Sequence, residues 1–160
     1  MSESNEIFTP DHVFLDLDAK SKRNVFECVS KMAEKVGVTN SASSLCDAIA
    51  EREEDGMTGL MDGFAIPHAK TSVVIRPSMF YVRVKHPLEW EPLDGEGVSS
   101  LFALVSPDGD KGSSHLKMLS ALATCLLEDD FKETVKRLGT ADELVSYVNE
   151  QAEGNTGLNR

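Results

Sequence analysis

The stretch Ser100-Leu101-Phe102-Ala103-Leu104-Val105 decides the fold class. After one serine, every residue in this run is apolar. A strand with one solvated face alternates apolar and polar residues, whereas a strand covered on both faces is apolar throughout. The run therefore predicts a central strand that lies between two layers of other structure.

Strand-like and helix-like patterns alternate along the rest of the chain. Further strands are predicted at residues 13–17, 73–75 and 79–84, with a short edge strand at 88–90 and a turn at 93–95. Helices are predicted from apolar periodicity and capping residues at about 21–36, 42–54, 113–126, 131–138 and from 140 onward. This alternation predicts one α/β domain with helices on both faces of a mostly buried sheet.

The length of 160 residues fits one domain with a sizeable core, without disulfides or metal. We expect the domain to occupy residues 1–160, with its core at about 7–150 and a loose tail at 151–160. Cys28, Cys46 and Cys125 are widely spaced, which predicts reduced thiols rather than a disulfide framework or a zinc site.

The net charge is −11, from 27 acidic and 16 basic residues. Nucleic acid is excluded as the main partner, because phosphate backbones need clustered Lys and Arg. The acidity serves solubility or recruits a basic protein, and composition leaves both open. No apolar stretch is long enough to span a bilayer, and residues 1–6 lack a signal-peptide pattern. A cytoplasmic protein without direct membrane insertion is predicted.

The stretch Gly63-Phe64-Ala65-Ile66-Pro67-His68-Ala69-Lys70 contains the candidate reactive residue. Pro67 has a fixed φ, donates no hydrogen bond and biases the preceding residue toward extended geometry. We expect strand pairing to stop there and to place His68 on a rigid, exposed corner. The alternative is a turn histidine with no chemical role.

Three other residues supply what a phosphorylated imidazole needs, since a phosphoryl group adds nearly two negative charges. Arg52 offers a fork of N–H donors, Thr58 a hydroxyl, and His115 an imidazole in the first turn of a helix, where backbone N–H groups are unpaired. Each has a plainer reading: Arg52 as a helix cap, for example, and His115 as a solvated residue. Spacing alone leaves the group undecided. His12 and His86 are interpreted as solvated loop residues.

The segment from Arg52-Glu53 through Thr58-Gly59 to Gly63-Phe64-Ala65-Ile66-Pro67-His68 closely resembles the signature of the fructose/mannitol-type enzyme IIA domains of the bacterial sugar phosphotransferase system. Later features also fit: Leu88-Glu89-Trp90, Leu93-Asp94-Gly95, the apolar strand, and His115-Leu116-Lys117. The resemblance covers roughly residues 7–150. One departure is Leu60-Met61, where many relatives have a further glycine.

The resemblance implies a single α/β domain with a mixed β-sheet sandwiched between helices. It implies that His68 accepts a phosphoryl group from the carrier protein HPr and passes it to a IIB domain, which works with a membrane IIC domain in sugar uptake of the fructose type. Arg52 and His115 match the family residues that flank the phosphorylated histidine. Because such transfer depends on positioning and charge stabilisation, no metal or cofactor is expected.

Two other functions compete with sugar transport. The first is a regulatory, nitrogen-type IIA protein whose phosphorylation state controls a partner protein. The second is a hydrolase that uses His68 and His115, but no motif places a serine or cysteine nucleophile beside either residue.

Overall fold

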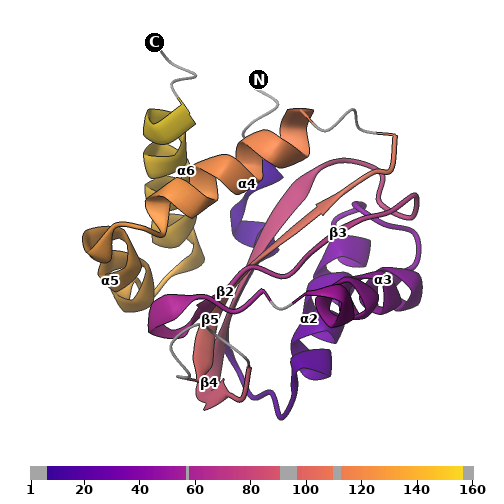
Figure 1. Ribbon diagram of the computed structural model, residues 1–160, viewed down its shortest axis with the longest axis horizontal. Helices are drawn as coiled ribbons and strands as arrows, with labels where there is room; N and C mark the ends of the chain where they lie inside the picture. The colour runs from indigo at the N-terminus through magenta and orange to yellow at the C-terminus, as the bar shows by residue number, and fades with distance from the viewer. Residues whose placement is uncertain (1–6, 57, 91–96, 110–112, 157–160) are drawn as a thin grey trace.

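Five strands and five α-helices make up the part of the chain that the structure, a computed structural model, describes: residues 7–56, 58–90, 97–109 and 113–156, with the backbone alone at 113–116 and 153–156 (Figure 1). The strands are β1 (Val13–Leu17), β2 (Phe64–Ala65), β3 (His68–Lys70), β4 (Ser78–Leu88) and β5 (Val98–Ser106). The helices are α2 (Lys22–Lys35), α3 (Ala42–Asp55), α4 (Ser113–Cys125), α5 (Asp129–Arg137) and α6 (Ala141–Thr156), and the 3-10 turns are η1 (Pro10–His12) and η2 (Met61–Gly63).

The strands form one mixed sheet in the order β1-β4-β5-β2, with β3 also paired to β5. β1 runs parallel to β4, β4 runs antiparallel to β5, and both β2 and β3 run parallel to β5. β2 lies opposite Ser100 and Leu101, and β3 lies opposite Leu104 to Ser106. The two short strands therefore follow one another along the same side of β5.

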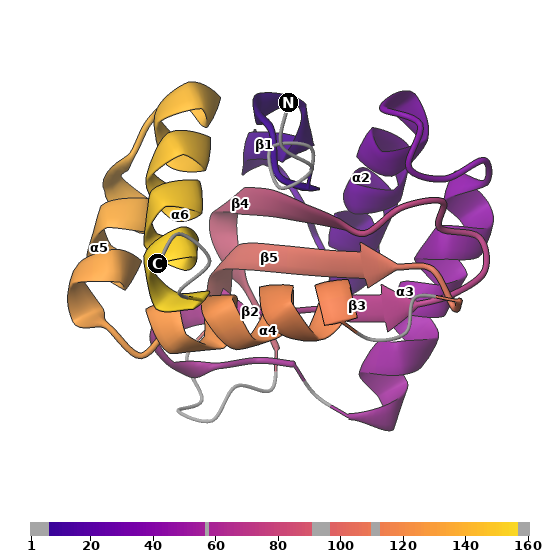
Figure 2. The ribbon, with the colours of Figure 1, turned by 90° about the horizontal axis from the view of Figure 1, so that it is seen from above.

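The side chains of β5 alternate between two apolar cores. Leu101, Ala103 and Val105 pack in one core, while Phe102 and Leu104 pack in the other. α2 and α3 complete the first core, and α4, α5 and α6 complete the second. Figures 1 and 2 show the sheet between these two helical layers. The apolar run at 100–105 is thus buried on both faces, and the predicted fold class is confirmed.

The helices begin where the sequence supplies capping side chains. The hydroxyl of Ser21 accepts a hydrogen bond from the Asn24 N–H at the start of α2, and Ser41 does the same for Ser44 at the start of α3. Before α6, the Thr140 hydroxyl accepts from the Glu143 N–H and contacts the Glu143 carboxylate at 3.1 Å. The helix starts predicted at residues 21 and 140 are confirmed, whereas the cap at Ser41 was not predicted.

The strand predicted at 73–75 is wrong. The Val74 N–H donates to the Thr71 carbonyl in a turn, and Val74 makes one isolated bridge, to Thr39. The Ile75 N–H donates to the Val38 carbonyl. These backbone groups are satisfied within their own turn and by the loop between α2 and α3 rather than by a neighbouring strand, so three apolar residues in a row did not make a strand.

The interpretation of His12 as a solvated loop residue is also wrong, since its exposed fraction is 2%. Its Nδ1 lies 2.9 Å from the Met79 carbonyl and 3.1 Å from the Ile7 carbonyl, and its ring stacks on Phe80. Burial lowers the pKa of His12 below its ordinary value of 6.5. His86 is exposed, as expected, but lies within β4 rather than in a loop.

The chain from residue 151, expected to be a loose tail, is helical as far as Thr156 because α6 continues through it. Glu150, Gln151, Ala152 and Glu153 are all good helix formers, which explains the longer helix. The turn predicted at 93–95 lies outside the described residues.

Candidate functional site

His68 lies at the start of β3, immediately after a break in the edge of the sheet. β2 ends at Ala65, Ile66 and Pro67 interrupt the strand, and pairing with β5 resumes at His68. The Pro67 carbonyl still accepts a hydrogen bond from the Leu104 N–H at 3.0 Å. The expected end of pairing and exposed corner are therefore wrong, because proline removes one donor but leaves its carbonyl and the following residue able to pair. His68 is half-buried.

The register of β3 shows which face of the sheet His68 occupies. His68 is paired with Leu104, and Ala69 is paired with Val105. Leu104 belongs to the core under α4, α5 and α6, whereas Ala69 and Val105 belong to the opposite core. Because side chains alternate along a strand, His68 projects on the face that α4 covers.

A backbone hydrogen bond defines the proton position on the His68 imidazole. Nδ1 of His68 lies 2.9 Å from the carbonyl oxygen of Ile66. A carbonyl oxygen can only accept, so Nδ1 holds a proton in this arrangement. In the neutral imidazole the lone pair is then on Nε2. A nucleophilic role of His68 would therefore use Nε2.

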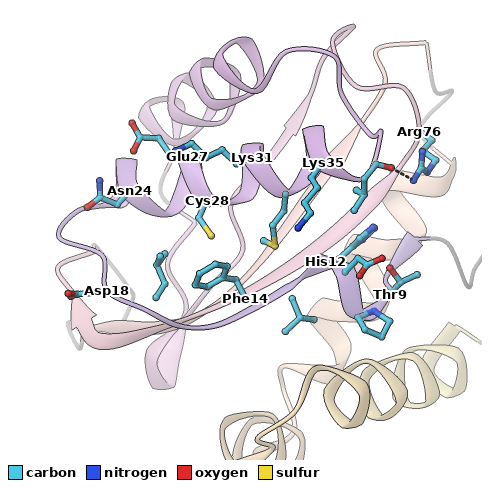
Figure 3. Close-up of a pocket in the computed structure, with 16 residues that line it drawn as sticks. Thr9, His12, Phe14, Asp18, Asn24, Glu27, Cys28, Lys31, Lys35 and Arg76 are labelled. Carbon is cyan, nitrogen blue, oxygen red and sulfur yellow. Dashed lines mark hydrogen bonds between the residues drawn. The ribbon is translucent and has the colours of Figure 1, made fainter.

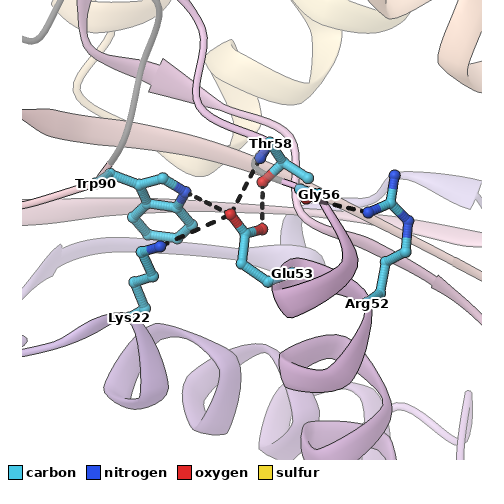
Figure 4. A network of polar contacts seen from close by, with 6 residues as sticks. All are labelled: Lys22, Arg52, Glu53, Gly56, Thr58 and Trp90. Carbon is cyan, nitrogen blue, oxygen red and sulfur yellow. Dashed lines mark hydrogen bonds and ion pairs between the residues drawn. The ribbon is translucent and has the colours of Figure 1, made fainter.

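The predicted donor Thr58 is buried and belongs to a network around Glu53 (Figure 4). The Thr58 hydroxyl donates to Oε1 of Glu53 at 2.5 Å, and the Thr58 N–H donates to Oε2 at 3.0 Å. The Trp90 indole N–H also donates to Oε2, at 3.0 Å, and the Lys22 ammonium lies 3.8 Å away. The hydroxyl proton of Thr58 is thus directed to a carboxylate, which leaves its oxygen as an acceptor.

Arg52 lies in the last turn of α3, as predicted, and its side chain points away from the Glu53 network (Figure 4). Its Nη1 donates to the Gly56 carbonyl at 3.1 Å, which is the contact of a helix-capping arginine. This bond uses one of the five donors of the guanidinium. A phosphoryl-binding role for Arg52 stays a prediction.

α4, the helix that contains His115, begins at Ser113 and packs on the His68 face of the sheet. Figure 2 shows α4 running along β5 on that side. The predicted first-turn position of His115 is confirmed for the backbone. Its side chain lies outside the described residues, so the expected neighbouring position of the two imidazoles stays a prediction.

The turn that leads into β2 is held by two lysines that sequence reasoning did not select. Asp62 and Gly63 have φ angles of 61° and 84°, and Lys132 of α5 bonds the Asp62 carboxylate at 2.5 Å. Lys136 donates to the Asp62 carbonyl and lies over the Phe64 ring. The hydrogen bond to Asp62 raises the pKa of Lys132. Gly63 suits this turn because positive φ is costly for residues with a Cβ.

Lys22 was not predicted as part of the site, and Glu53 and Trp90 stand out in the sequence only as parts of motifs. A carboxylate beside an arginine at the end of a helix was an available signal for Glu53. Nothing in the sequence pairs Trp90 or Lys22 with it, since 37 positions separate Trp90 from Glu53.

An open groove of about 1060 Å³ lies between β1 and α2, and His68 does not line it (Figure 3). Its lining includes Phe14, Cys28, Lys35 and Arg76. Burial raises the pKa of Cys28 to about 11, so this thiol is protonated at neutral pH and is a poor nucleophile. The groove offers no alternative reactive centre among these residues.

Within the described ranges, no group of three or more His, Cys, Asp or Glu side chains is arranged to hold a metal ion. Among the same residues, no helix is both long and apolar enough to cross a membrane.

Known proteins similar to this chain agree with its fold. A family model described as "Phosphoenolpyruvate-dependent sugar phosphotransferase system, EIIA 2" matches residues 6–151. The chain belongs to this family. The resemblance predicted from the Pro67-His68 signature is thereby confirmed, and membership implies phosphoryl transfer through a histidine.

Sugar-specific components and nitrogen regulatory proteins are both similar to this EIIA chain. The fructose-specific EIIABC component of Bacillus subtilis (strain 168) is 30% identical over 145 residues, which are 91% of this chain and 23% of that protein. The chain thus spans about a quarter of that relative. A nitrogen regulatory protein of Pseudomonas aeruginosa is 27% identical over 148 residues, 92% of this chain and 96% of that protein.

The structure of the EIIA chain is similar to the crystal structure of the nitrogen regulatory protein IIA-Ntr from Neisseria meningitidis. The TM-score is 0.84 and the identity 29%, over 92% of this chain and 99% of the other. The mixed sheet between helices is therefore a known EIIA architecture.

Proposed function

We propose that this EIIA chain is a cytoplasmic phosphocarrier that receives a phosphoryl group from phospho-HPr on His68 and passes it to a IIB domain. The IIB domain then phosphorylates a sugar of the fructose type as the membrane IIC domain imports it. The observation that supports this most directly is the Nδ1–Ile66 carbonyl hydrogen bond, which leaves the lone pair of the half-buried imidazole on Nε2.

The first transfer, from HPr to His68, breaks one P–N bond and forms another. The Nε2 lone pair of His68 forms a bond to phosphorus while the bond between phosphorus and the HPr imidazole breaks, and the HPr nitrogen keeps that electron pair. In the second step, an acceptor side chain of IIB attacks phosphorus and Nε2 leaves. Such transfers have loose transition states, so the protein contributes position and charge stabilisation. No metal or cofactor takes part in either step.

Three groups would stabilise the phosphoryl charge. The donors of Arg52 that do not hold Gly56 would face the equatorial oxygens, and His115 would donate from the first turn of α4. The backbone N–H groups of that turn are suited to anions. The Thr58 hydroxyl proton is directed to Glu53, so Thr58 would contribute least.

A second function within the family is regulation, in which the phosphorylation state of His68 controls a partner protein. One observation favours it: the structure is similar to the Neisseria IIA-Ntr crystal structure at a TM-score of 0.84 and 29% identity, and the Pseudomonas nitrogen regulatory protein is 27% identical over 148 residues.

The test is a reconstituted phosphotransfer chain. Enzyme I, HPr, phosphoenolpyruvate and the EIIA chain should give an acid-labile, base-stable adduct, and a fructose-type IIB domain should then remove it. Phosphorylation followed by transfer to IIB supports the transport function. Phosphorylation without transfer to any IIB domain tested favours regulation, and absence of phosphorylation contradicts both.

A further inference from the structure

We propose that Glu53 is a positioning residue for the phosphorylated histidine, acting through Thr58 and Ile66 on the proton position of His68. The proposal rests on the proposed function for its kinetic consequence, but its structural part concerns the unphosphorylated protein alone.

Glu53 is buried and surrounded by hydrogen-bond donors. Its exposed fraction is 7%, and its two carboxylate oxygens accept three hydrogen bonds, two from Thr58 and one from Trp90. The Lys22 ammonium lies 3.8 Å from the carboxylate and 5.1 Å from the centre of the Trp90 ring. A carboxylate fixed from several sides in this way has little freedom to move.

A strand-like segment that begins at Thr58 connects Glu53 to Ile66. The Ile66 N–H donates to the Thr58 carbonyl at 2.9 Å, the Leu60 N–H donates to the Phe64 carbonyl at 2.7 Å, and Gly59 bridges Ala65 in antiparallel fashion. Residues 58–60 therefore line the open side of β2 as far as Ile66. Because Glu53 holds both the N–H and the hydroxyl of Thr58, it fixes the end of this segment that faces Ile66.

The Ile66 carbonyl accepts a hydrogen bond from Nδ1 of His68 at 2.9 Å. Ile66 is held by Thr58 at its N–H, and Pro67 is held by Leu104 at its carbonyl. The Ile66 carbonyl lies between these two anchors. Loss of the first anchor would let that carbonyl rotate, and Nδ1 would then lose its acceptor and Nε2 its fixed lone pair.

In this arrangement two adjacent residues at the end of α3 have different roles. Arg52 points away from the network and reaches Gly56, while Glu53 points into it (Figure 4). Arg52 would act on the phosphoryl group itself. Glu53 would act earlier, by keeping the imidazole in the tautomer that can attack.

The experiment compares Glu53→Met with Glu53→Gln in the full chain. Methionine has a similar length and an adaptable thioether but cannot accept from Thr58 and Trp90. Glutamine can accept the two N–H bonds through its carbonyl and donate to the Thr58 oxygen through its amide. Glu54→Met is the matched control, because Glu54 is the next residue of the same helix and is exposed.

Two measurements are made on each variant. The ¹⁵N chemical shifts of His68, recorded at increasing pH until they stop changing, give the tautomer of the neutral imidazole without any partner protein. Rapid-quench phosphorylation by phospho-HPr gives the rate. Emission from Trp90, the only tryptophan, shows whether the variant is folded and whether the network has changed.

We expect Glu53→Met to show the Nε2–H tautomer and to be phosphorylated about tenfold more slowly, as loss of one ordinary hydrogen bond predicts. Glu53→Gln should restore the tautomer and most of the rate, and Glu54→Met should match the parent chain. A folded Glu53→Met protein with the parent tautomer overturns the proposal, whatever its rate.

If Glu53→Met does not fold, Thr58→Val decides the question. It removes only the hydroxyl that donates to Glu53, and it keeps the side-chain shape and the backbone N–H. A partial shift toward the Nε2–H tautomer supports the proposal, and an unchanged tautomer overturns it. Failure of the proposed function appears separately, as a parent chain that phospho-HPr does not phosphorylate, because the tautomer measurement needs no HPr.

Discussion

Replacing Arg52 by alanine separates two roles that the structure allows for this side chain. In the unphosphorylated protein the guanidinium holds the Gly56 carbonyl at 3.1 Å, beyond the end of α3. Loss of that bond should lower the free energy of unfolding by about 1 kcal/mol, as for an ordinary hydrogen bond. A role as helix cap alone predicts this loss and no effect on phosphoryl transfer.

A charge-assisted bond to a phosphoryl oxygen predicts a much larger effect on rate. Such bonds contribute about 1.5–3 kcal/mol, which corresponds to a roughly ten- to hundredfold slower transfer in Arg52→Ala. Arg52→Lys should recover only part of the rate, because an ammonium lacks the planar fork. Rates come from rapid-quench transfer of radiolabelled phosphate from phospho-HPr, and stabilities from urea unfolding.

Arg23→Ala is the control for general loss of a cation. Arg23 pairs with Asp47 on the surface of α2 and α3, and it lies outside the proposed site. Its replacement should leave transfer unchanged. Transfer at the parent rate in a folded Arg52→Ala protein would refute the phosphoryl-binding role and leave Arg52 as a helix cap.

Two further predictions concern the other histidines. His115→Ala should retain some phosphorylation of His68 but slow its onward transfer to IIB, measured as decay of labelled protein after IIB is added; decay at the parent rate would contradict this. Because burial lowers the pKa of folded His12, the unfolded chain binds a proton more readily, so stability should be complete above pH 6.5 and fall as the pH drops below it. In His12→Gln the slope of unfolding free energy against pH, from urea titrations, should be smaller over that range, and an equal slope would exclude His12 as its source.

The elements that local sequence determines were predicted well. The run at 100–105 is typical of a strand covered on both faces and lies in β5, and the helix predicted from residue 140 begins with the Thr140–Glu143 contact. The Pro67-His68 signature also led to the correct family. These features depend on periodicity, capping and motif spacing, all of which are visible within a short window.

The predictions that were wrong concern features that depend on contacts between distant parts of the chain. His12 follows a proline and an aspartate, as a loop residue would, but the Met79 carbonyl and the Phe80 ring, 67 and 68 positions away, bury it. Pro67 locally signals the end of a strand, yet the Leu104 N–H across the sheet keeps the edge paired. The Glu53–Trp90 bond was beyond sequence reasoning for the same reason.

The most direct test of the account is the position of the phosphoryl group in the phosphorylated chain. We predict a single phosphohistidine at His68 with phosphorus on Nε2, because Nδ1 donates to the Ile66 carbonyl. Two-dimensional ¹H–¹⁵N NMR of the ¹⁵N-histidine-labelled protein distinguishes the two ring nitrogens, and His68→Ala should abolish the signal. Phosphorylation on Nδ1, or label that persists in His68→Ala, would contradict phosphoryl transfer through Nε2 of His68.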